Sequence, residues 1–178
     1  VLTVGRLQAR KGQDMMIKAI PEILKAKPNF LYAIVGDGEE FDALVKLSAE
    51  LEVEQHVQFL RGITDEQMIE CYQQCDLFIL PNRTIDNDIE GFGMVLVEAQ
   101  SCGKPVVAGD SGGTKETMLL GESGVIIDAT QPSNIASTVV GMLSDEQKLK
   151  DMGSKGREHV LKSLDWKALV QRAKELFA

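Results

Sequence analysis

Short apolar runs alternate with amphipathic stretches along nearly the whole chain. The amphipathic stretches include Asp14–Lys27 and Glu39–Leu51, where apolar positions recur with the period of a helix. Strands that alternate with helices of this length predict a doubly wound α/β domain, in which helices cover both faces of a parallel sheet. The six runs that predict its strands are Leu2–Val4, Leu31–Val35, Val57–Leu60, Leu77–Leu80, Val106–Ala108 and Val125–Ile127.

Several helix ends are also marked in the sequence. The stretches Thr64–Gln67 and Ser144–Gln147 each fit a capping box, so a helix is expected to start directly after Thr64 and after Ser144. The tail Pro132–Ala178 is expected to be almost entirely helical, with a break near Ser163–Asp165. Trp166 is expected to open the last helix and to anchor it by packing.

Composition narrows the class of protein. The 178 residues fit one domain, 1–178, and a net charge of −8 argues against a nucleic-acid partner. No apolar run approaches the length of roughly 20 residues that a membrane-spanning helix needs. Cys71, Cys75 and Cys102 lack zinc-ligand spacing and indicate free thiols in a cytoplasmic protein. The chain opens at Val1 inside a predicted strand, so we expect it to be part of a longer protein.

Five glycine-rich loops follow predicted strands and precede predicted helices. Such loops share the carboxyl edge of a parallel sheet, where open α/β sheets bind their ligands. The sequence therefore predicts one functional edge, although Gly36-Asp37-Gly38 is interpreted as turn chemistry rather than ligand contact. The loops are GRLQARKG (5–12), VGDGEE (35–40), RGITDE (61–66), PNRTIDNDIEGFG (81–93) and GDSGGTKE (109–116).

The first of these loops concentrates positive charge in an acidic protein. Residues 1–28 contain six Lys and Arg against two acidic residues, a balance of +4, which leaves −12 for the rest of a chain with net charge −8. Arg6 and Lys11 are expected to contact the diphosphate of a nucleotide and to stabilise it as a leaving group. Arg10 is expected to point to solvent instead.

The stretch EGFGMVLVEA (90–99) suggests the rest of a nucleotide-sugar site. Gly91 and Gly93 let a backbone approach a phosphate at a helix start. Glu98 lies about 7 Å further along the helix, where its carboxylate could accept bonds from a ribose. Glu90 precedes the helix, where a sugar on the distal phosphate would lie. The alternative for Glu98 is an ion pair with a neighbouring lysine.

Together these motifs resemble the C-terminal, donor-binding domain of retaining GT-B glycosyltransferases of group 1 (family 4). The resemblance covers the whole chain and predicts a Rossmann-like six-stranded sheet with a helical tail, one half of a GT-B fold. The motifs that carry it are Gly5-Arg6 with Lys11-Gly12, Gly36 with Gly38, Glu90 with Glu98, and Pro105 followed by Gly112-Gly113 and Glu116.

The resemblance implies a role for each part of the edge. Arg6 and Lys11, in the loop that begins at Gly5, would bind the diphosphate. Glu90 would bind the hydroxyl groups of the sugar, and Glu98 would bind the ribose. The donor would be a UDP-sugar or a GDP-sugar. Among family members, the motifs are most similar to those of enzymes that use GDP-mannose and a lipid acceptor. Peripheral membrane association of the full-length enzyme is compatible with a lipid acceptor. The loop at Arg61 would border the base. Backbone groups would contact the phosphate and the sugar at Phe92, Gly93, Met94 and Val95.

The family's N-terminal acceptor domain, which supplies a catalytic-site histidine, is absent from these 178 residues. His56 and His159 match no family motif and are interpreted as surface residues. No cofactor or divalent metal is expected, because Arg6 and Lys11 supply the positive charge and Asp86 and Asp88 fit a solvated loop. A nucleotide-sugar 2-epimerase, a phosphorylase and a non-catalytic nucleotide-sugar sensor remain alternatives.

Overall fold

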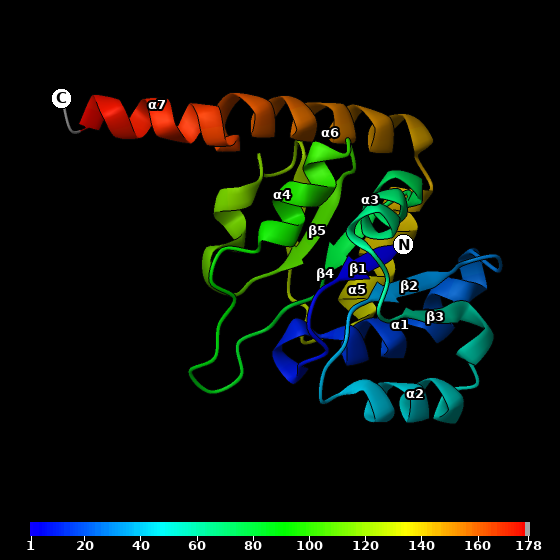
Figure 1. The fold of residues 1–178 in the computed structure, drawn as a ribbon. Coiled ribbons are helices and arrows are strands. Elements are labelled where there is room, and N and C mark those ends of the chain that lie inside the picture. Colours follow the sequence, from blue (N-terminus) through cyan, green and yellow to red (C-terminus); the bar gives the residue numbers. More distant parts are fainter. Residues whose placement is uncertain (177–178) are drawn as a thin grey trace.

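A single sheet of six parallel strands forms the centre of the molecule (Figure 1). The structure is a computed structural model and describes residues 1–176. Each predicted strand is present, with ends that differ by one residue at most. The strands are β1 Leu2–Val4, β2 Tyr32–Val35, β3 Val57–Leu60, β4 Phe78–Leu80, β5 Val106–Gly109 and β6 Gly124–Ile127.

An α-helix follows every strand except β5, which is followed by the 3-10 helix Gly112–Thr117, and the helix after β6 opens the helical tail. The predicted tail is confirmed to Leu176, and residues 177–178 lie outside the described part of the chain. A π-helical turn, Val160–Leu164, precedes the last helix. The α-helices are α1 Gln13–Ala26, α2 Phe41–Glu50, α3 Asp65–Gln74, α4 Met94–Ser101, α5 Pro132–Leu143, α6 Glu146–His159 and α7 Trp166–Leu176.

The two faces of the sheet bury two separate apolar clusters. Because successive strand residues point to opposite faces, Leu77 and Ile79 pack in one cluster whereas Phe78 and Leu80 pack in the other. The first cluster lies under α1, α2 and α5, and the second lies under α3 and α4. Helix α6 contacts both α4 and α5. This arrangement confirms the doubly wound α/β fold.

The strand order is β3-β2-β1-β4-β5-β6, so the order of connection reverses between the neighbours β1 and β4. In open α/β sheets the loops that leave two such strands diverge, and the crevice between them is where ligands bind. Here those loops are residues 5–12 and 81–93. The topology therefore brings the basic loop and the loop of Glu90 together.

One predicted helix start is confirmed and another is wrong. Thr64 caps α3 with both hydrogen bonds of a capping box. Ser144 does not cap α6, because its hydroxyl donates to the Val140 carbonyl at the end of α5. Asp145 takes the capping position and accepts a hydrogen bond from the Lys148 N–H.

Helix α7 continues past α6 and extends beyond the body of the domain (Figure 1). Trp166 opens this helix as predicted, but its side chain is 76% exposed, so the expectation that it packs as an anchor is wrong. None of the described helices is long and apolar enough to span a bilayer.

Candidate functional site

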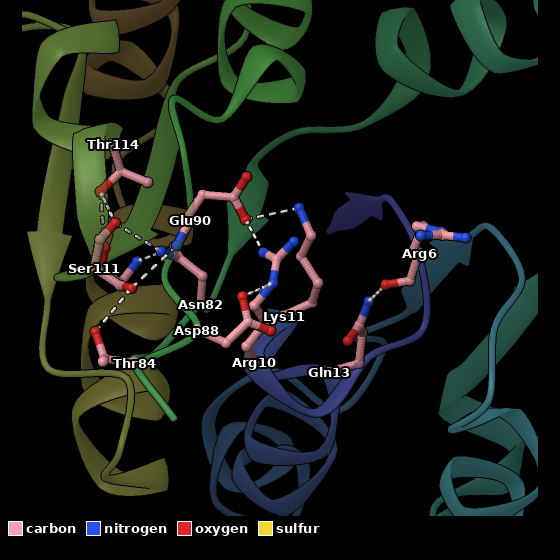
Figure 2. A network of polar contacts seen from close by, with 11 residues as sticks. Arg6, Arg10, Lys11, Gln13, Asn82, Thr84, Asp88, Glu90, Ser111 and Thr114 are labelled. Carbon is pink, nitrogen blue, oxygen red and sulfur yellow. Dashed lines mark hydrogen bonds and ion pairs between the residues drawn. The ribbon is translucent and has the colours of Figure 1, made fainter. Parts of the chain in front are cut away.

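The crevice between β1 and β4 holds a compact charged group made by Arg10, Lys11 and Glu90 (Figure 2). The Lys11 ammonium lies 2.7 Å from Glu90 Oε2, and the Arg10 guanidinium lies 2.6 Å from the same oxygen. Their side chains are 18% exposed for Arg10, 11% for Lys11 and 9% for Glu90. Charges this shielded from water interact more strongly than surface pairs. The structure therefore brings together Lys11 and Glu90, as the sequence predicts for a shared site.

The expectation that Arg10 points to solvent is wrong. A short 3-10 helix, Ala9–Lys11, turns Arg10 inward, and its Nε also lies 3.1 Å from Asp88 Oδ1. Asp88 was expected to belong to a solvated loop. Its side chain is 67% exposed, but it also makes this ion pair. Arg10 thus links the first loop to two acidic residues of the fourth.

Arg6 occupies a different position. Its side chain is exposed and lies apart from the Arg10–Lys11–Glu90 group in Figure 2. The Arg6 carbonyl accepts a hydrogen bond of 3.1 Å from the Gln13 side chain at the start of α1. The backbone at Arg6 is therefore fixed, while its guanidinium extends from the rim of the crevice.

A second arginine, Arg83, joins the fourth loop to the first loop and to α1. Arg83 donates two hydrogen bonds to the Asp14 carboxylate, at 2.8 and 3.2 Å, and its backbone N–H donates to the Arg10 carbonyl at 2.8 Å. Gly12 leaves room for this contact, because a Cβ there would lie 1.8 Å from the Pro81 carbonyl oxygen. The two walls of the crevice are thus joined by backbone and side-chain bonds.

The loop of Glu90 rests on the loop that follows β5. A Cβ on Gly112 would lie 1.6 Å from the Glu90 carbonyl oxygen, so the two backbones are in direct contact. The Ser111 hydroxyl accepts a hydrogen bond from the Glu90 N–H, and the Asn82 amide donates to the Ser111 carbonyl (Figure 2). The position of Glu90 is therefore set by residues 109–113 as well as by its own loop.

The second glycine-rich loop packs against the first in the same way. A Cβ on Gly36 would lie 2.0 Å from the Gly5 carbonyl oxygen, and one on Gly38 would lie 2.4 Å from that of Leu7. Both glycines have positive φ, at 144° and 159°. These contacts fit the interpretation of Gly36-Asp37-Gly38 as turn chemistry, which leaves close backbone packing as its main role.

Arg61, the residue expected to border the nucleobase, lies at the outer end of the edge. It donates to Asp37 at 2.8 Å and its guanidinium stacks over the Phe41 ring at 4.1 Å. The hydrogen bond from Arg61, together with one from the Gly38 N–H, holds the pKa of Asp37 below its usual value. Arg61 is therefore fixed on an exposed surface next to the second loop.

The start of α4 has the geometry expected of a phosphate-binding backbone. Gly93 precedes the helix in the left-handed region, with φ 82°, and Met94 at the first position of the helix is exposed. Phe92 and Val95 are half-buried on either side. Free N–H groups at such a helix start favour anions.

Glu98 lies one turn further along α4 and is half-buried. Its partner among the described residues is Tyr72 of α3, whose hydroxyl donates to Glu98 Oε2 at 2.7 Å, and not a lysine. Burial, together with this hydrogen bond and the negative charge of Glu98, raises the pKa of Tyr72 well above its usual value. The phenol thus stays a donor at neutral pH and fixes the carboxylate.

The two histidines lie away from the crevice and are less exposed than expected. His56 Nδ1 lies 2.9 Å from the Phe30 carbonyl oxygen, and His159 lies at the end of α6 with its Nε2 buried. Both are half-buried, so each lies at the surface with only part of its side chain exposed. The three cysteines are free thiols, and residues 1–176 offer no group of three or more metal-ligating side chains.

Sequence reasoning missed three residues that shape the site. Arg10 could have been found from the need of a buried carboxylate for a cation. No local signal pointed to Arg83 or Tyr72, because their partners lie on other elements.

Residues 1–159 match the family described as glycosyl transferases group 1. The chain belongs to this family. A GDP-mannose-dependent alpha-(1-6)-phosphatidylinositol monomannoside mannosyltransferase of Mycolicibacterium smegmatis is 39% identical over 180 residues, covering 100% of this chain and 47% of the relative. A GDP-mannose-dependent monoacylated alpha-(1-6)-phosphatidylinositol monomannoside mannosyltransferase of Corynebacterium glutamicum is 36% identical over 170 residues, covering 94% and 44%. The chain therefore spans about half the length of these group 1 relatives.

Solved structures place the fold in the same family. The Anabaena protein HepE in complex with UDP superposes with a TM-score of 0.86 at 27% identity, covering 99% of this chain and 48% of that one. The C-terminal domain of a group 1 glycosyl transferase, LpcC of Francisella tularensis, gives a TM-score of 0.80 at 20% identity and covers 93% and 86%. The Rossmann-like fold of one half of a GT-B glycosyltransferase is thereby confirmed.

Proposed function

We propose that this chain is the donor-binding half of a retaining hexosyltransferase, which transfers a sugar from a nucleoside diphosphate to an acceptor. Membership of the group 1 family supports glycosyl transfer in general. Retention of configuration, the donor and the acceptor are the specific parts of the proposal. The missing half is an N-terminal acceptor domain of the same protein.

The contact of Lys11 with Glu90 at 2.7 Å, in the crevice between β1 and β4, carries this proposal. A donor sugar presents two chemistries side by side, an anionic diphosphate and a neutral ring with hydroxyl groups. An ammonium matches the first, and a carboxylate that accepts hydrogen bonds matches the second. The diphosphate and the sugar of a donor are covalently linked, so the ammonium and the carboxylate that bind them must lie close together, as Lys11 and Glu90 do.

The other predicted residues extend this site along the edge. Arg6, at the rim, and the backbone from Phe92 to Val95 at the start of α4 would bind the phosphates. Glu98, held by Tyr72, would accept bonds from the ribose. Arg61 would border the base. Positive charge placed near a departing diphosphate lowers the barrier to its release, and one such contact is worth roughly 10²–10³ in rate.

GDP-mannose is the donor to test first. Relatives that cover nearly the whole chain at 36–39% identity are named as GDP-mannose-dependent mannosyltransferases that act on phosphatidylinositol mannosides. The structural neighbour at 27% identity holds UDP instead, which makes UDP-sugars the second class. A lipid acceptor fits peripheral membrane association of the full-length protein, and free thiols fit a cytoplasmic location.

Calorimetry on the 178-residue chain tests the proposal with GDP, GDP-mannose, UDP and UDP-glucose. At least one nucleotide should bind, and a ligand at 100 times its Kd should raise the free energy of unfolding by about 2.7 kcal/mol. Lys11→Ala should weaken that binding by roughly 10²-fold. Lys155→Ala is the matched control, because Lys155 pairs with Glu122 on another surface.

Failure of all four nucleotides to bind the unmodified chain would overturn the proposal, as would equal losses in both lysine variants. Sugar transfer is expected only from the full-length protein, because the acceptor half is missing from these residues. Sustained transfer by the 178-residue chain would contradict the division of labour between the two halves.

A further inference from the structure

Glu90 has two cations on one of its oxygens. Arg10 and Lys11 both contact Oε2, at 2.6 and 2.7 Å, while no described residue donates a hydrogen bond to Oε1. Arg10 also pairs with a second carboxylate, that of Asp88, but the Asp88 side chain is 67% exposed and solvated, so both positive charges remain available to the buried Glu90. One of the two can therefore change partners without leaving Glu90 uncompensated.

The surroundings of the two cations show which of them can move. Arg10 is held at three points: its Nε by Asp88 at 3.1 Å, its NH1 group by Glu90, and its carbonyl by the Arg83 N–H at 2.8 Å. Among residues 1–176 the Lys11 ammonium has one ionic partner, Glu90. Lys11 is buried, but its flexible four-carbon stem allows the ammonium to turn within the crevice. Arg10 is therefore the more firmly held of the two cations.

A diphosphate that binds Lys11 competes with Glu90 for that ammonium. The side chain of Glu90 is only 9% exposed, so water cannot replace a lost cation there. Removing one partner from a buried ion pair is strongly unfavourable, because it leaves a charge uncompensated. Binding through Lys11 is therefore favourable only if another cation stays on Glu90.

We propose that Arg10 is the positioning residue that keeps Glu90 neutralised while Lys11 turns to the diphosphate. Arg10 holds Oε2, so Oε1 stays directed to the hydroxyls of the sugar. Arg10 itself contacts neither phosphate nor sugar and acts through Glu90. The inference rests on the proposed function, since it requires that Lys11 binds a nucleoside diphosphate.

A double-variant cycle read by calorimetry with GDP, or with UDP if only UDP binds, tests this role. Arg10→Gln should weaken binding of the bare nucleotide by roughly tenfold, because Lys11 then leaves an uncompensated carboxylate behind. Glu90→Gln alone should strengthen it, because the diphosphate then no longer competes with a carboxylate for Lys11. In the double variant the loss caused by Arg10→Gln should disappear, since the neutral amide needs no cation.

Two results would overturn the inference. A tenfold loss that persists in the Glu90→Gln background would show that Arg10 contacts the phosphates directly. Unchanged affinity in Arg10→Gln would show that it has no role in the exchange. If Arg10→Gln does not fold, Arg10→Lys provides the same comparison, and it should bind GDP within about threefold of the unmodified chain, because the charge is kept.

Arg83→Gln is the matched control. Arg83 joins the same two loops but pairs with Asp14, so its loss should lower the melting temperature without producing a loss of affinity that Glu90→Gln restores. If the unmodified chain binds neither GDP nor UDP, the proposed function fails first. If it binds and only the cycle fails, the role of Arg10 alone is wrong.

Discussion

The carboxylate of Glu98 is held by a phenol rather than by a cation. The hydrogen bond of 2.7 Å from Tyr72 occupies Oε2 and leaves the negative charge on α4 without a described ionic partner. A carboxylate in that state accepts further hydrogen bonds readily, which suits the two hydroxyls of a ribose. Glu90, by contrast, is already neutralised by two cations. The two acidic residues of the motif are therefore prepared for different partners.

Exchange of either carboxylate for alanine should separate these partners. Glu98→Ala should weaken binding of the bare nucleoside diphosphate by roughly 10- to 100-fold, the range for hydrogen bonds to a charged group. Glu90→Ala should leave that binding intact and weaken only the sugar-bearing donor. Calorimetry with GDP and GDP-mannose on both variants measures the difference. Similar losses for both ligands in both variants would contradict the order of sugar, phosphate and ribose along the edge.

Among the elements of the fold, the loops at the carboxyl edge pack through backbone rather than side chains. Gly112 has φ 62° and its Cα faces the Glu90 carbonyl oxygen so closely that a Cβ would lie 1.6 Å from it. The loop after β5 therefore supports the backbone of the Glu90 loop. A change at Gly112 should weaken binding at the proposed sugar site, although no side chain of that site is altered.

Gly112→Ala tests this coupling, and Gly121→Ala is its matched control. Both positions have positive φ, at 62° and 75°, but a Cβ on Gly121 would meet nothing within 4 Å. Gly121→Ala should cost about 1–2 kcal/mol of stability, the penalty for a left-handed alanine. Gly112→Ala should cost more and should also weaken GDP-mannose binding. Equal melting temperatures and equal affinities for the two variants would show that the loop after β5 does not support the Glu90 loop.

Helix capping shows what sequence patterns decide at this scale. The capping role of Thr64 was correctly predicted, because Thr64 lies between a strand and a helix and only one helix end is available to it. Ser144 and Asp145 are the two residues between α5 and α6. The Ser144 hydroxyl donates a hydrogen bond to the end of α5, and Asp145 caps α6 instead. The pattern locates the boundary but does not say which of two adjacent polar residues takes each helix end.

At the scale of the whole molecule, an acidic protein places two cations in its crevice, where both contact a carboxylate. The net charge is −8, yet Arg10 and Lys11 lie together in the crevice and the start of α4 opens on the same edge. A diphosphate bound at this edge would meet side-chain cations and free backbone N–H groups. Among residues 1–176 no set of three metal-ligating side chains accompanies them. From the cations and the N–H groups we propose that the site neutralises its ligand without a divalent cation.

Nucleotide binding should therefore be independent of Mg²⁺ and Mn²⁺. The affinity of the chain for GDP in excess EDTA should agree within about twofold with the affinity in the presence of either ion, because Lys11 and the backbone N–H groups at the start of α4 would already supply the positive charge that a diphosphate needs. The full-length protein should likewise turn over in EDTA. Binding or turnover that is abolished by the chelator and restored by Mg²⁺ would overturn the phosphate role of Lys11.

The global arrangement marks the limit of what the sequence could predict. Periodicity identified every strand and placed five loops at one edge, because parallel strands share a direction. It did not give the strand order, since apolar runs do not record which neighbours they pair with. Without the adjacency of β1 and β4, the contact of Arg10 with Glu90 was invisible and Arg10 was assigned to solvent. The local chemistry was readable, whereas its long-range pairing was not.

The glycine contacts between loops have a practical consequence for engineering donor preference. Residues 5–12 touch 36–40 at two points where no side chain fits, and 109–113 touch the Glu90 loop at others. In libraries that randomise one of these segments alone, most new side chains at the contact positions will clash with the backbone of the other loop. The contacting segments should therefore be replaced together, as a pair taken from one natural protein. The loop at Arg61 is different, because a Cβ on Gly62 would meet nothing within 4 Å, although the φ of 64° at Gly62 still favours glycine. Diversity for base selection is best introduced first at the neighbours of Gly62 in this loop.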